Sequence, residues 1–325
     1  MKNILCSKNK FDDSFKIGEF YLNSSFNKKD NDYFLVIGEL FSHSQLELVN
    51  IVIKKEYKLL NTIDGEFCLI NYNSKKNILT ICSDRAGRNI TFYTSDGFIS
   101  TDFWASIKHL NYKLSDVSSQ SLKEHIFFNT GLSNNTIIDG LNIVPPATHI
   151  KIEDSIMHSD RYWEFKFTKN NLTESEKMDQ FDDLLNKSFK LIKQKNSNEC
   201  KYGIGISGGL DSRIIPYYAN KNKMKLNSFI IGKERPNYLF LSNDHYLSNK
   251  IAKLFNLKLE SFQPDNFNIE DRMNQDVLHN PYGSSQLYKI IDPQKMKFDV
   301  LLTGASGYYI GASPNYSKVL KFDIL

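Results

Sequence analysis

The sequence has few cysteines and no large excess of charge of either sign. The four cysteines among its 325 residues show neither metal-finger spacing nor a redox pair, which predicts reduced thiols, buried or half-buried, in a cytoplasmic protein: Cys6, Cys68, Cys82 and Cys200. Lys and Arg number 41 against 37 Asp and Glu, a net charge of only +4. Such a small excess gives no case for nucleic acid as a partner.

The sequence also lacks long apolar runs. No run approaches the roughly 18 residues that a membrane-spanning helix needs, and the first residues lack the apolar stretch of about 7 to 15 residues of a secretory signal. Hydrophobic residues make up 41% and charged residues 24% of the chain, as in globular proteins. This composition excludes a disordered chain, a collagen-like repeat and a disulfide-stapled miniprotein. We expect two domains and no membrane partner.

The first half of the sequence is rich in short β-branched and aromatic runs separated by Asn, Asp, Ser and Gly turns. This pattern predicts one helix over 44–55 and β-strands over 33–38, 66–71, 78–82, 90–94 and 149–152. Residues 1–165 are therefore predicted to form an α+β domain dominated by antiparallel sheet.

The pattern changes after Trp163. A capping box at Thr173–Glu176 predicts the start of an amphipathic helix of about five turns. Its apolar stripe is expected to pack in a core: Met178, Phe181, Leu184, Leu185, Ser188, Leu191 and Ile192. Strands alternating with helices are then predicted over 202–206, 226–231, 257–262 and 298–302. Because this alternation is typical of parallel sheets, residues 166–325 are predicted to form an α/β domain, with ligands beyond the carboxyl ends of its strands.

The most informative segment is the sequence Ser-Gly-Gly-Leu-Asp-Ser, between a predicted strand and a predicted helix. Gly208 and Gly209 bring backbone N–H groups close to an anion, which the helix N-terminus also attracts. Ser207 and Ser212 can donate hydroxyls to phosphate oxygens. Asp211 would repel phosphate unless Mg²⁺, which accepts one or two carboxylates with phosphate oxygens, lies between. The alternative is a structural helix entry with a capping serine and tight-turn glycines.

This segment resembles the pyrophosphate-binding loop of the N-type ATP pyrophosphatases, and in particular that of class B asparagine synthetase and its relatives. Those enzymes adenylate a carboxylate with ATP, release pyrophosphate and pass the acyl group to an amine. The resemblance implies an adenine nucleotide α-hydrolase-like second domain that binds ATP and Mg²⁺, with the metal on Asp211. It assigns contacts with ATP or pyrophosphate to Ile206, Ser207, Gly208, Gly209, Asp211, Ser212, Ile231, Thr303 and Gly304.

The first half of the chain carries the same resemblance. The stretch from Leu60 to Tyr93 is similar to the family's segment in which a Gly-x-Phe strand leads to an Asp-Arg-x-Gly turn. We expect Asp84 and Arg85 to form a structural ion pair at that turn. The resemblance implies a glutamine amidotransferase type 2-like first domain, and it covers nearly the whole chain from about residue 33.

Some positions depart from the family's glutaminase. Its nucleophile is a cysteine directly after the initiator methionine, whereas Lys2 stands there in this sequence and Cys6 lies further along. Ile37 replaces an Asn of the oxyanion hole, and isoleucine cannot donate that hydrogen bond. We therefore expect no glutamine hydrolysis and a first domain retained as a scaffold.

The second domain departs from the family as well. Ala305 and Tyr308 stand where the family has a catalytic Glu and an Asp that binds Mg²⁺. A phenol that ionises near pH ~10 is a poor Mg²⁺ ligand at neutral pH, so we expect weak metal binding and slow or absent adenylation. The sequence ends at Leu325, before the family's helical region with its catalytic lysine. The sequence leaves open a truncated gene product, a fragment or a shortened paralogue, and a homodimer or a partner chain that supplies this region.

Two interpretations therefore stand. In the first, the chain is an ATP-dependent, amide-forming ligase of EC class 6.3, which joins a small-molecule carboxylate to an amine in amino-acid or natural-product biosynthesis. Its nitrogen would come from ammonia or from the substrate itself, as in β-lactam synthetase, which also lacks the cysteine. In the second, the chain is a catalytically inactive or truncated relative that keeps the fold and nucleotide binding and acts as a scaffold or partner. Ala305, Tyr308 and the missing region favour the second.

Overall fold

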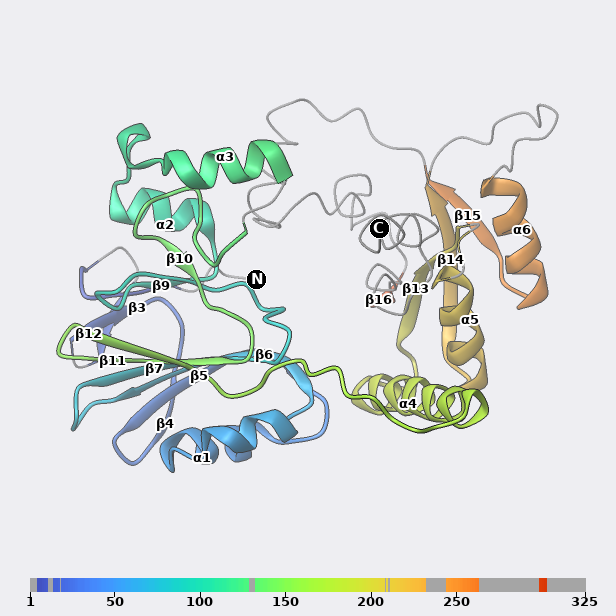
Figure 1. The fold of residues 1–325 in the computed structure, drawn as a ribbon, viewed down its shortest axis with the longest axis horizontal. Coiled ribbons are helices and arrows are strands. Elements are labelled where there is room, and N and C mark those ends of the chain that lie inside the picture. The colour runs from blue at the N-terminus through green and yellow to red at the C-terminus, as the bar shows by residue number, and fades with distance from the viewer. Residues whose placement is uncertain are drawn as a thin grey trace. The chain divides into compact units, whose positions relative to one another are not determined.

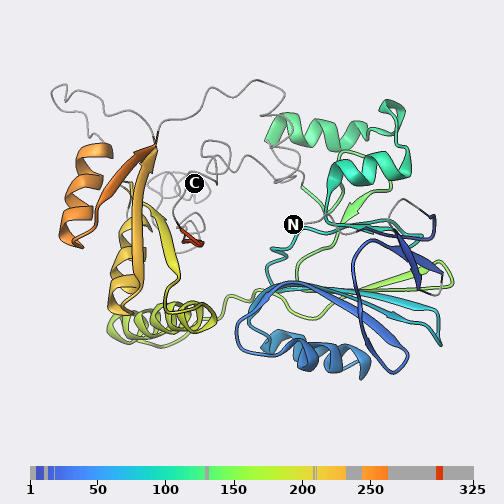
Figure 2. The ribbon, with the colours of Figure 1, turned by 180° about the vertical axis from the view of Figure 1, so that it is seen from behind.

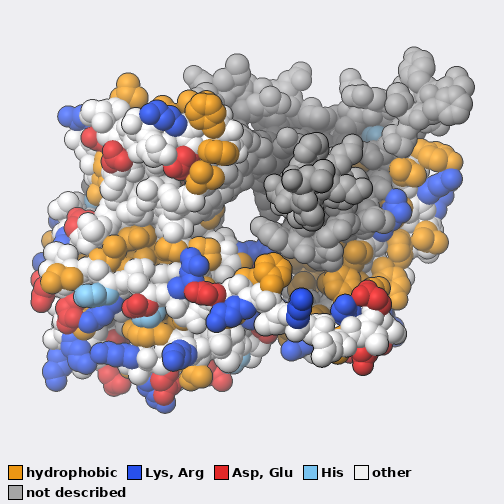
Figure 3. All heavy atoms as spheres, in the orientation of Figure 1, with side chains coloured by type: hydrophobic (Ala, Val, Ile, Leu, Met, Phe, Trp, Pro, Cys, Tyr) orange, Lys and Arg blue, Asp and Glu red, His pale blue; other side chains and the backbone are white. Residues whose placement is uncertain are grey.

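The computed structural model describes residues 5–10, 14–17, 19–128, 132–207, 209, 211–231, 244–262 and 298–302. The chain divides into two compact units, the first containing Met1–Lys169 and the second Asn170–Asn268 (Figure 1; Figure 2 shows the ribbon from behind). Charged side chains of both signs lie mixed on the described surface seen in Figure 3. None of the helices in the described part of the chain has the length and apolar character needed to cross a bilayer.

The first unit contains two six-stranded antiparallel sheets, with the strand orders β10-β8-β9-β1-β3-β2 and β12-β11-β7-β6-β5-β4. The first sheet consists of β1 (Leu5–Ser7), β2 (Phe15–Ile17), β3 (Phe20–Leu22), β8 (Phe92–Tyr93), β9 (Ile99–Ser100) and β10 (Asn142–Ile143). The second sheet consists of β4 (Asn27–Lys29), β5 (Asp32–Leu40), β6 (Gly65–Asn73), β7 (Ile78–Ser83), β11 (Thr148–Glu153) and β12 (Ile156–Arg161).

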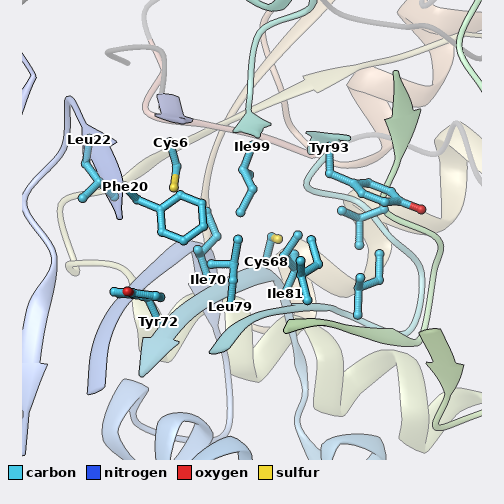
Figure 4. Packing of buried hydrophobic residues seen from close by; sticks show 13 residues of the cluster. Cys6, Phe20, Leu22, Cys68, Ile70, Tyr72, Leu79, Ile81, Tyr93 and Ile99 are labelled. Carbon is cyan, nitrogen blue, oxygen red and sulfur yellow. The ribbon is translucent and has the colours of Figure 1, made fainter. Parts of the chain in front are cut away.

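The central strands of the second sheet are buried on both faces. Successive side chains point to opposite sides of a strand, and each side packs in a cluster of its own. On β6, Cys68 and Ile70 lie in the core between the two sheets, which Figure 4 shows. On the other face, Phe67 packs with helix α1 (Gln45–Ile53) and the 3-10 helix η1 (Tyr57–Thr62). Burial on both faces explains why these strands read as continuous apolar runs.

Helix α2 (Phe103–Leu110) packs on the outer side of the first sheet through Phe103, which lies in a cluster with Phe92 and Phe98. A short 3-10 helix η2 (Leu114–Asp116) and helix α3 (Ser119–Phe128) follow it. The first unit is therefore layered as α1, two sheets and α2 (Figure 1). The predicted α+β character with antiparallel sheet is confirmed.

The second unit contains a four-stranded parallel sheet with the order β15-β14-β13-β16. Its strands are β13 (Lys201–Gly205), β14 (Lys225–Ile231), β15 (Leu259–Phe262) and β16 (Val300–Leu302). Its helices are α4 (Glu174–Lys195), α5 (Asp211–Lys221) and α6 (Asp244–Leu254). Helix α5 contacts β13 and β14, and α6 contacts β14 and β15. The predicted parallel sheet is confirmed in the described residues.

Helix α4 begins at the predicted capping box of Thr173, and only part of its predicted apolar stripe lies on the core. The expected core residues Met178 and Leu184 are 64% and 65% exposed, whereas Phe189 is buried and Ile192 packs beside it. The predicted stripe is wrong at Met178, Leu184 and Ser188, which are exposed, and is confirmed at Leu185 and Ile192, which pack on the core of the second unit.

Candidate functional site

The Ser-Gly-Gly-Leu-Asp-Ser loop lies at the carboxyl edge of the parallel sheet, since β13 ends at Gly205 and α5 begins at Asp211. The register pairs Gly205 with Phe229 of β14, and Ile204 with Leu302 at the end of β16. The carboxyl ends of these neighbouring strands therefore lie together, at the edge where parallel α/β sheets bind ligands.

Ile206 fixes the point at which the chain leaves the sheet. Its side chain is 1% exposed and belongs to the core of the second unit. Its N–H donates to the carbonyl of Phe229 at 2.9 Å, and its own carbonyl accepts the hydroxyl of Ser248 at 3.0 Å. In the described contacts Ile206 is an anchor for the loop, and its contact with a nucleotide stays a prediction.

Ser248 is the anchoring residue that sequence reasoning missed. It lies on α6 and is fully buried. Two large apolar residues of this helix, Tyr246 and Leu254, are 49% and 79% exposed, so its apolar residues alone do not mark the buried face. The available signal was that Ser248 stands one helical turn before the buried Ala252, and a serine at core spacing must find a partner. Its hydrogen bond to Ile206 couples α6 to the start of the loop.

Ser207 and Gly209 are exposed residues of the loop. The N–H of Gly209 donates to Ser207 Oγ at 3.2 Å. A Cβ at residue 209 would lie only 3.3 Å from that oxygen, so a larger residue would crowd the hydroxyl. Because a hydroxyl can accept one hydrogen bond and donate another, this geometry is compatible with the predicted donation from Ser207 to a phosphate oxygen.

The remaining predicted residues are placed by their backbone or lie outside the described residues. Asp211 and Ser212 are the first residues of α5, where N–H groups have no partner within the helix. Ile231 ends β14 and pairs with Phe262 of β15. The described residues exclude Gly208, Thr303, Gly304, Ala305 and Tyr308.

Helix α5 is held in place by α4 as well as by the sheet. The hydroxyl of Tyr218 donates to Asp182 of α4 at 2.8 Å, and Lys221 pairs with the same carboxylate at 2.9 Å. Burial, together with the hydrogen bond to Asp182, raises the pKa of Tyr218 to about 12. These contacts hold α5 against α4, and α5 also contacts β13 and β14 of the sheet. The partial positive charge of its N-terminus lies at the end of the loop.

The residues present fit Mg²⁺ only together with a nucleotide. Within the described ranges, no cluster of three or more His, Cys, Asp or Glu side chains is placed to hold a metal ion. Asp211 is the single carboxylate residue of the segment 206–212. One carboxylate together with phosphate oxygens is a donor set that Mg²⁺ accepts, so a metal that arrives with ATP suits this loop.

The described part of the first unit places no cysteine as a nucleophile. Cys6 is 1% exposed in the core between the sheets (Figure 4), and burial raises the pKa of its thiol far above the ordinary value. Since the thiolate is the attacking form, Cys6 is not placed to attack glutamine. All four cysteines are free and buried, which confirms the predicted burial.

The predicted ion pair between Asp84 and Arg85 is wrong. Arg85 pairs with Asp64, while Asp84 is 1% exposed. The Asp84 carboxylate closes its own turn by accepting three backbone N–H groups at 2.7 to 3.1 Å, those of Phe67, Ala86 and Arg88. Burial raises the pKa of the Asp84 carboxyl, and the N–H groups oppose that shift. The carboxylate is directed inward to the backbone, so it does not reach the neighbouring guanidinium.

No protein-family model matches this chain. A comparison with curated proteins also finds no match. Among solved structures, the chain is similar to glutamine phosphoribosylpyrophosphate (PRPP) amidotransferase from B. subtilis, complexed with ADP and GMP. The two share 10% sequence identity with a TM-score of 0.29, over 85% of this chain and 79% of that chain. These values assign the chain to no family, so its function is proposed from its own residues.

Proposed function

We propose that the second unit binds Mg-ATP through the loop between β13 and α5 and belongs to an ATP-dependent, amide-forming ligase of the asparagine synthetase type. The observation that carries this proposal is the position of the Ser-Gly-Gly-Leu-Asp-Ser sequence. It connects the carboxyl end of an inner parallel strand to a helix N-terminus, the arrangement in which backbone N–H groups bind phosphate.

Each loop residue has a defined task in this proposal. Gly208 and Gly209 let the backbone approach the pyrophosphate of ATP, and Ser207 and Ser212 donate hydroxyls to its oxygens. Asp211 would hold the Mg²⁺ ion, which neutralises charge on the phosphates when it is bound. The first N–H groups of α5 add the attraction of the helix N-terminus.

The reaction has two steps. A carboxylate oxygen of the substrate attacks the α-phosphorus of ATP, and the bond from that phosphorus to the bridging oxygen breaks, so that pyrophosphate leaves and an acyl adenylate forms. An amine then attacks the acyl carbon, expels AMP and loses a proton to give the amide. The loop's contribution is to bind and orient the leaving pyrophosphate. Since Cys6 supplies no thiolate, the nitrogen would come from ammonia or from an amine of the substrate.

Nucleotide binding without turnover is the second candidate function. Ala305 and Tyr308 favour it, since they stand where the resembled family has acidic residues. Neither side chain supplies a carboxylate to a metal or a proton acceptor to the reaction. The chain would then be a scaffold whose loop binds a nucleotide without reacting with it.

Exchange of radiolabelled pyrophosphate into ATP distinguishes these functions. The full chain is incubated with ATP, Mg²⁺ and labelled pyrophosphate, with one carboxylic acid at a time from a panel that includes amino acids. Label that enters ATP only with a particular acid, and not in Asp211→Asn, supports the ligase. ATP binding without exchange for any acid supports the second candidate. Loss of both signals contradicts the proposed function.

A further inference from the structure

The second sheet of the first unit extends beyond the helix that covers it. Along β11, Ile150 points into the core between the sheets, so His149 lies on the opposite face, next to its cross-strand partner Asp160 of β12. Tyr57 of η1 stacks on the His149 ring, with centroids 3.7 Å apart and planes 11° apart. Strand β12 is exposed along its whole length, so this end of the face is open.

A cavity of about 510 Å³ lies at this open end. Its volume is within the range of small-molecule sites, roughly 300 to 1,000 Å³. The aromatic part of its wall comes from the Tyr57–His149 stack and Tyr162, and the cationic part from three exposed side chains, Lys55, Lys58 and Arg161. The aromatic wall can contact an apolar group and the cationic rim can bind a negative charge, so the cavity suits an organic anion.

The cationic side chains that line the cavity outnumber its carboxylates. Its lining contains three cationic side chains but only two carboxylates, those of Glu56 and Asp160. Among the described residues, Lys58 and Arg161 form no ion pair. Asp160 Oδ2 lies 3.8 Å from His149 Nε2, and burial lowers the pKa of His149 while Asp160 opposes that shift. Convergent cations in a concave site attract an anion and bind it by charge-assisted hydrogen bonds.

Lys55 reaches this rim from a backbone position where glycine is usual. It follows α1 in the left-handed conformation, with φ +60°. Its N–H bonds to the carbonyl of Val52 at 3.0 Å, and the N–H of Glu56 bonds to that of Ile51 at 2.9 Å, which is the Schellman pattern. Glycine would make the same turn with less strain, so the lysine side chain is present at a cost in stability.

We propose that this cavity binds a small molecule carrying a phosphate or carboxylate group, with Lys55, Lys58 and Arg161 on the anion and the Tyr57–His149 stack beside its apolar part. The site is built from residues of the first unit alone and does not depend on the function proposed for the second unit.

Nuclear magnetic resonance of the full chain, titrated separately with inorganic phosphate and with succinate, tests this site. We expect saturable shifts at the amides of 55–59 and 160–162. A response to phosphate identifies a phosphate ligand, and a response to succinate identifies a carboxylate ligand. Replacing Lys58 and Arg161 together with Gln is expected to weaken the affinity by about tenfold or more, because each hydrogen bond to a charged group contributes roughly that factor.

One control variant and one further test variant make the experiment specific. Lys75→Gln combined with Lys76→Gln removes the same charge from the exposed turn between β6 and β7, and should leave the affinity unchanged. Lys55→Gly removes a rim cation while relieving the left-handed strain, so it should weaken anion binding without lowering the melting temperature. An equal loss of anion affinity in the two double variants, at positions 58 and 161 and at positions 75 and 76, overturns the proposal. So does the lack of a saturable response to both anions at 55–59 and 160–162.

Discussion

At the scale of single residues, the loop of the second unit depends on a buried hydroxyl outside the loop. Ser248 on α6 donates to the carbonyl of Ile206, so it sets the point from which the loop leaves β13. This carbonyl lies beside residues proposed to contact phosphate. If the loop binds phosphate as proposed, Ser248 is a positioning residue that acts through Ile206.

We predict that Ser248→Ala weakens Mg-ATP binding about tenfold and lowers the free energy of unfolding by about 1–3 kcal/mol, because the carbonyl of Ile206 loses its buried donor. Calorimetric titration and urea unfolding measure the two effects. Ser188→Ala is the matched control, since Ser188 bonds to Leu184 one turn earlier on an exposed part of α4. A loss of stability with unchanged Mg-ATP affinity would show that Ser248 has a structural role only.

The turn at Asp84 gives a prediction for the first unit. Asp84→Ala leaves three backbone N–H groups without their acceptor, so we expect the free energy of unfolding to fall by about 2–4 kcal/mol. Asp84→Asn keeps one acceptor oxygen and should lose less. Asp64→Ala, which breaks only the half-exposed pair with Arg85, should cost less than about 1 kcal/mol. Urea unfolding of the three variants tests this order, and equal losses at positions 64 and 84 would contradict it.

At the scale of elements, several helices end without glycine. The residue in the left-handed conformation after each of α1, α2, α5 and α6 is Lys55, Asn111, Lys223 and Asn256, with φ between +53° and +60°. Glycine after a helix is the usual sequence signal for its end. Asn111 and Asn256 are of the residue type that follows helices when glycine does not, whereas Lys55 and Lys223 give no sequence signal for the helix end.

We predict that Lys223→Gly stabilises the chain by about 1 kcal/mol, because glycine adopts the left-handed conformation at no steric cost. The bonds that define this end, from Lys223 N–H to Asn220 and from Met224 N–H to Ala219, are backbone bonds and remain. Lys187→Gly in the exposed interior of α4 is the matched control and should destabilise by about 0.7 kcal/mol. Thermal unfolding that gives both variants the same sign would contradict the prediction.

How far the sequence predicted an element depended on its length and burial. The strands β5, β6 and β7 were found within a few residues because long apolar runs carry a readable pattern. Strands of two or three residues, such as β1, β2 and β9, have no period to read. Strand β12 is exposed throughout and is fixed by pairing with β11 rather than by its own pattern.

The sequence likewise predicted one part of the candidate site and not another. The loop was predicted because glycine, serine and aspartate requirements are local and occur in consecutive residues. The partners of Ser248 and Asp84 were not predicted, because their hydrogen bonds join residues 42 and 17 positions apart, to Ile206 and Phe67. Which side chain points inward at such positions is decided by tertiary packing.

At the scale of the whole molecule, each of the two units has buried hydrophobic clusters of its own and a candidate binding site of its own. The cavity beside Tyr57 lies in the first unit, and the loop after β13 lies in the second. We predict that Lys58→Gln with Arg161→Gln leaves Mg-ATP affinity unchanged, and that Asp211→Asn leaves anion binding at the cavity unchanged. Calorimetry and magnetic resonance on both variants check this independence. Loss of both Mg-ATP binding and anion binding in either variant would contradict this independence.

The central claim is that the loop between β13 and α5 binds the pyrophosphate of ATP with Mg²⁺. Calorimetric titration of the full chain with Mg-ATP, with Asp211→Asn alongside, tests it most directly. The account predicts a single site with a dissociation constant in about the micromolar range, which the substitution removes or weakens at least about tenfold. Absence of binding, or binding that Asp211→Asn leaves unchanged, would contradict the assignment of this loop to a nucleotide.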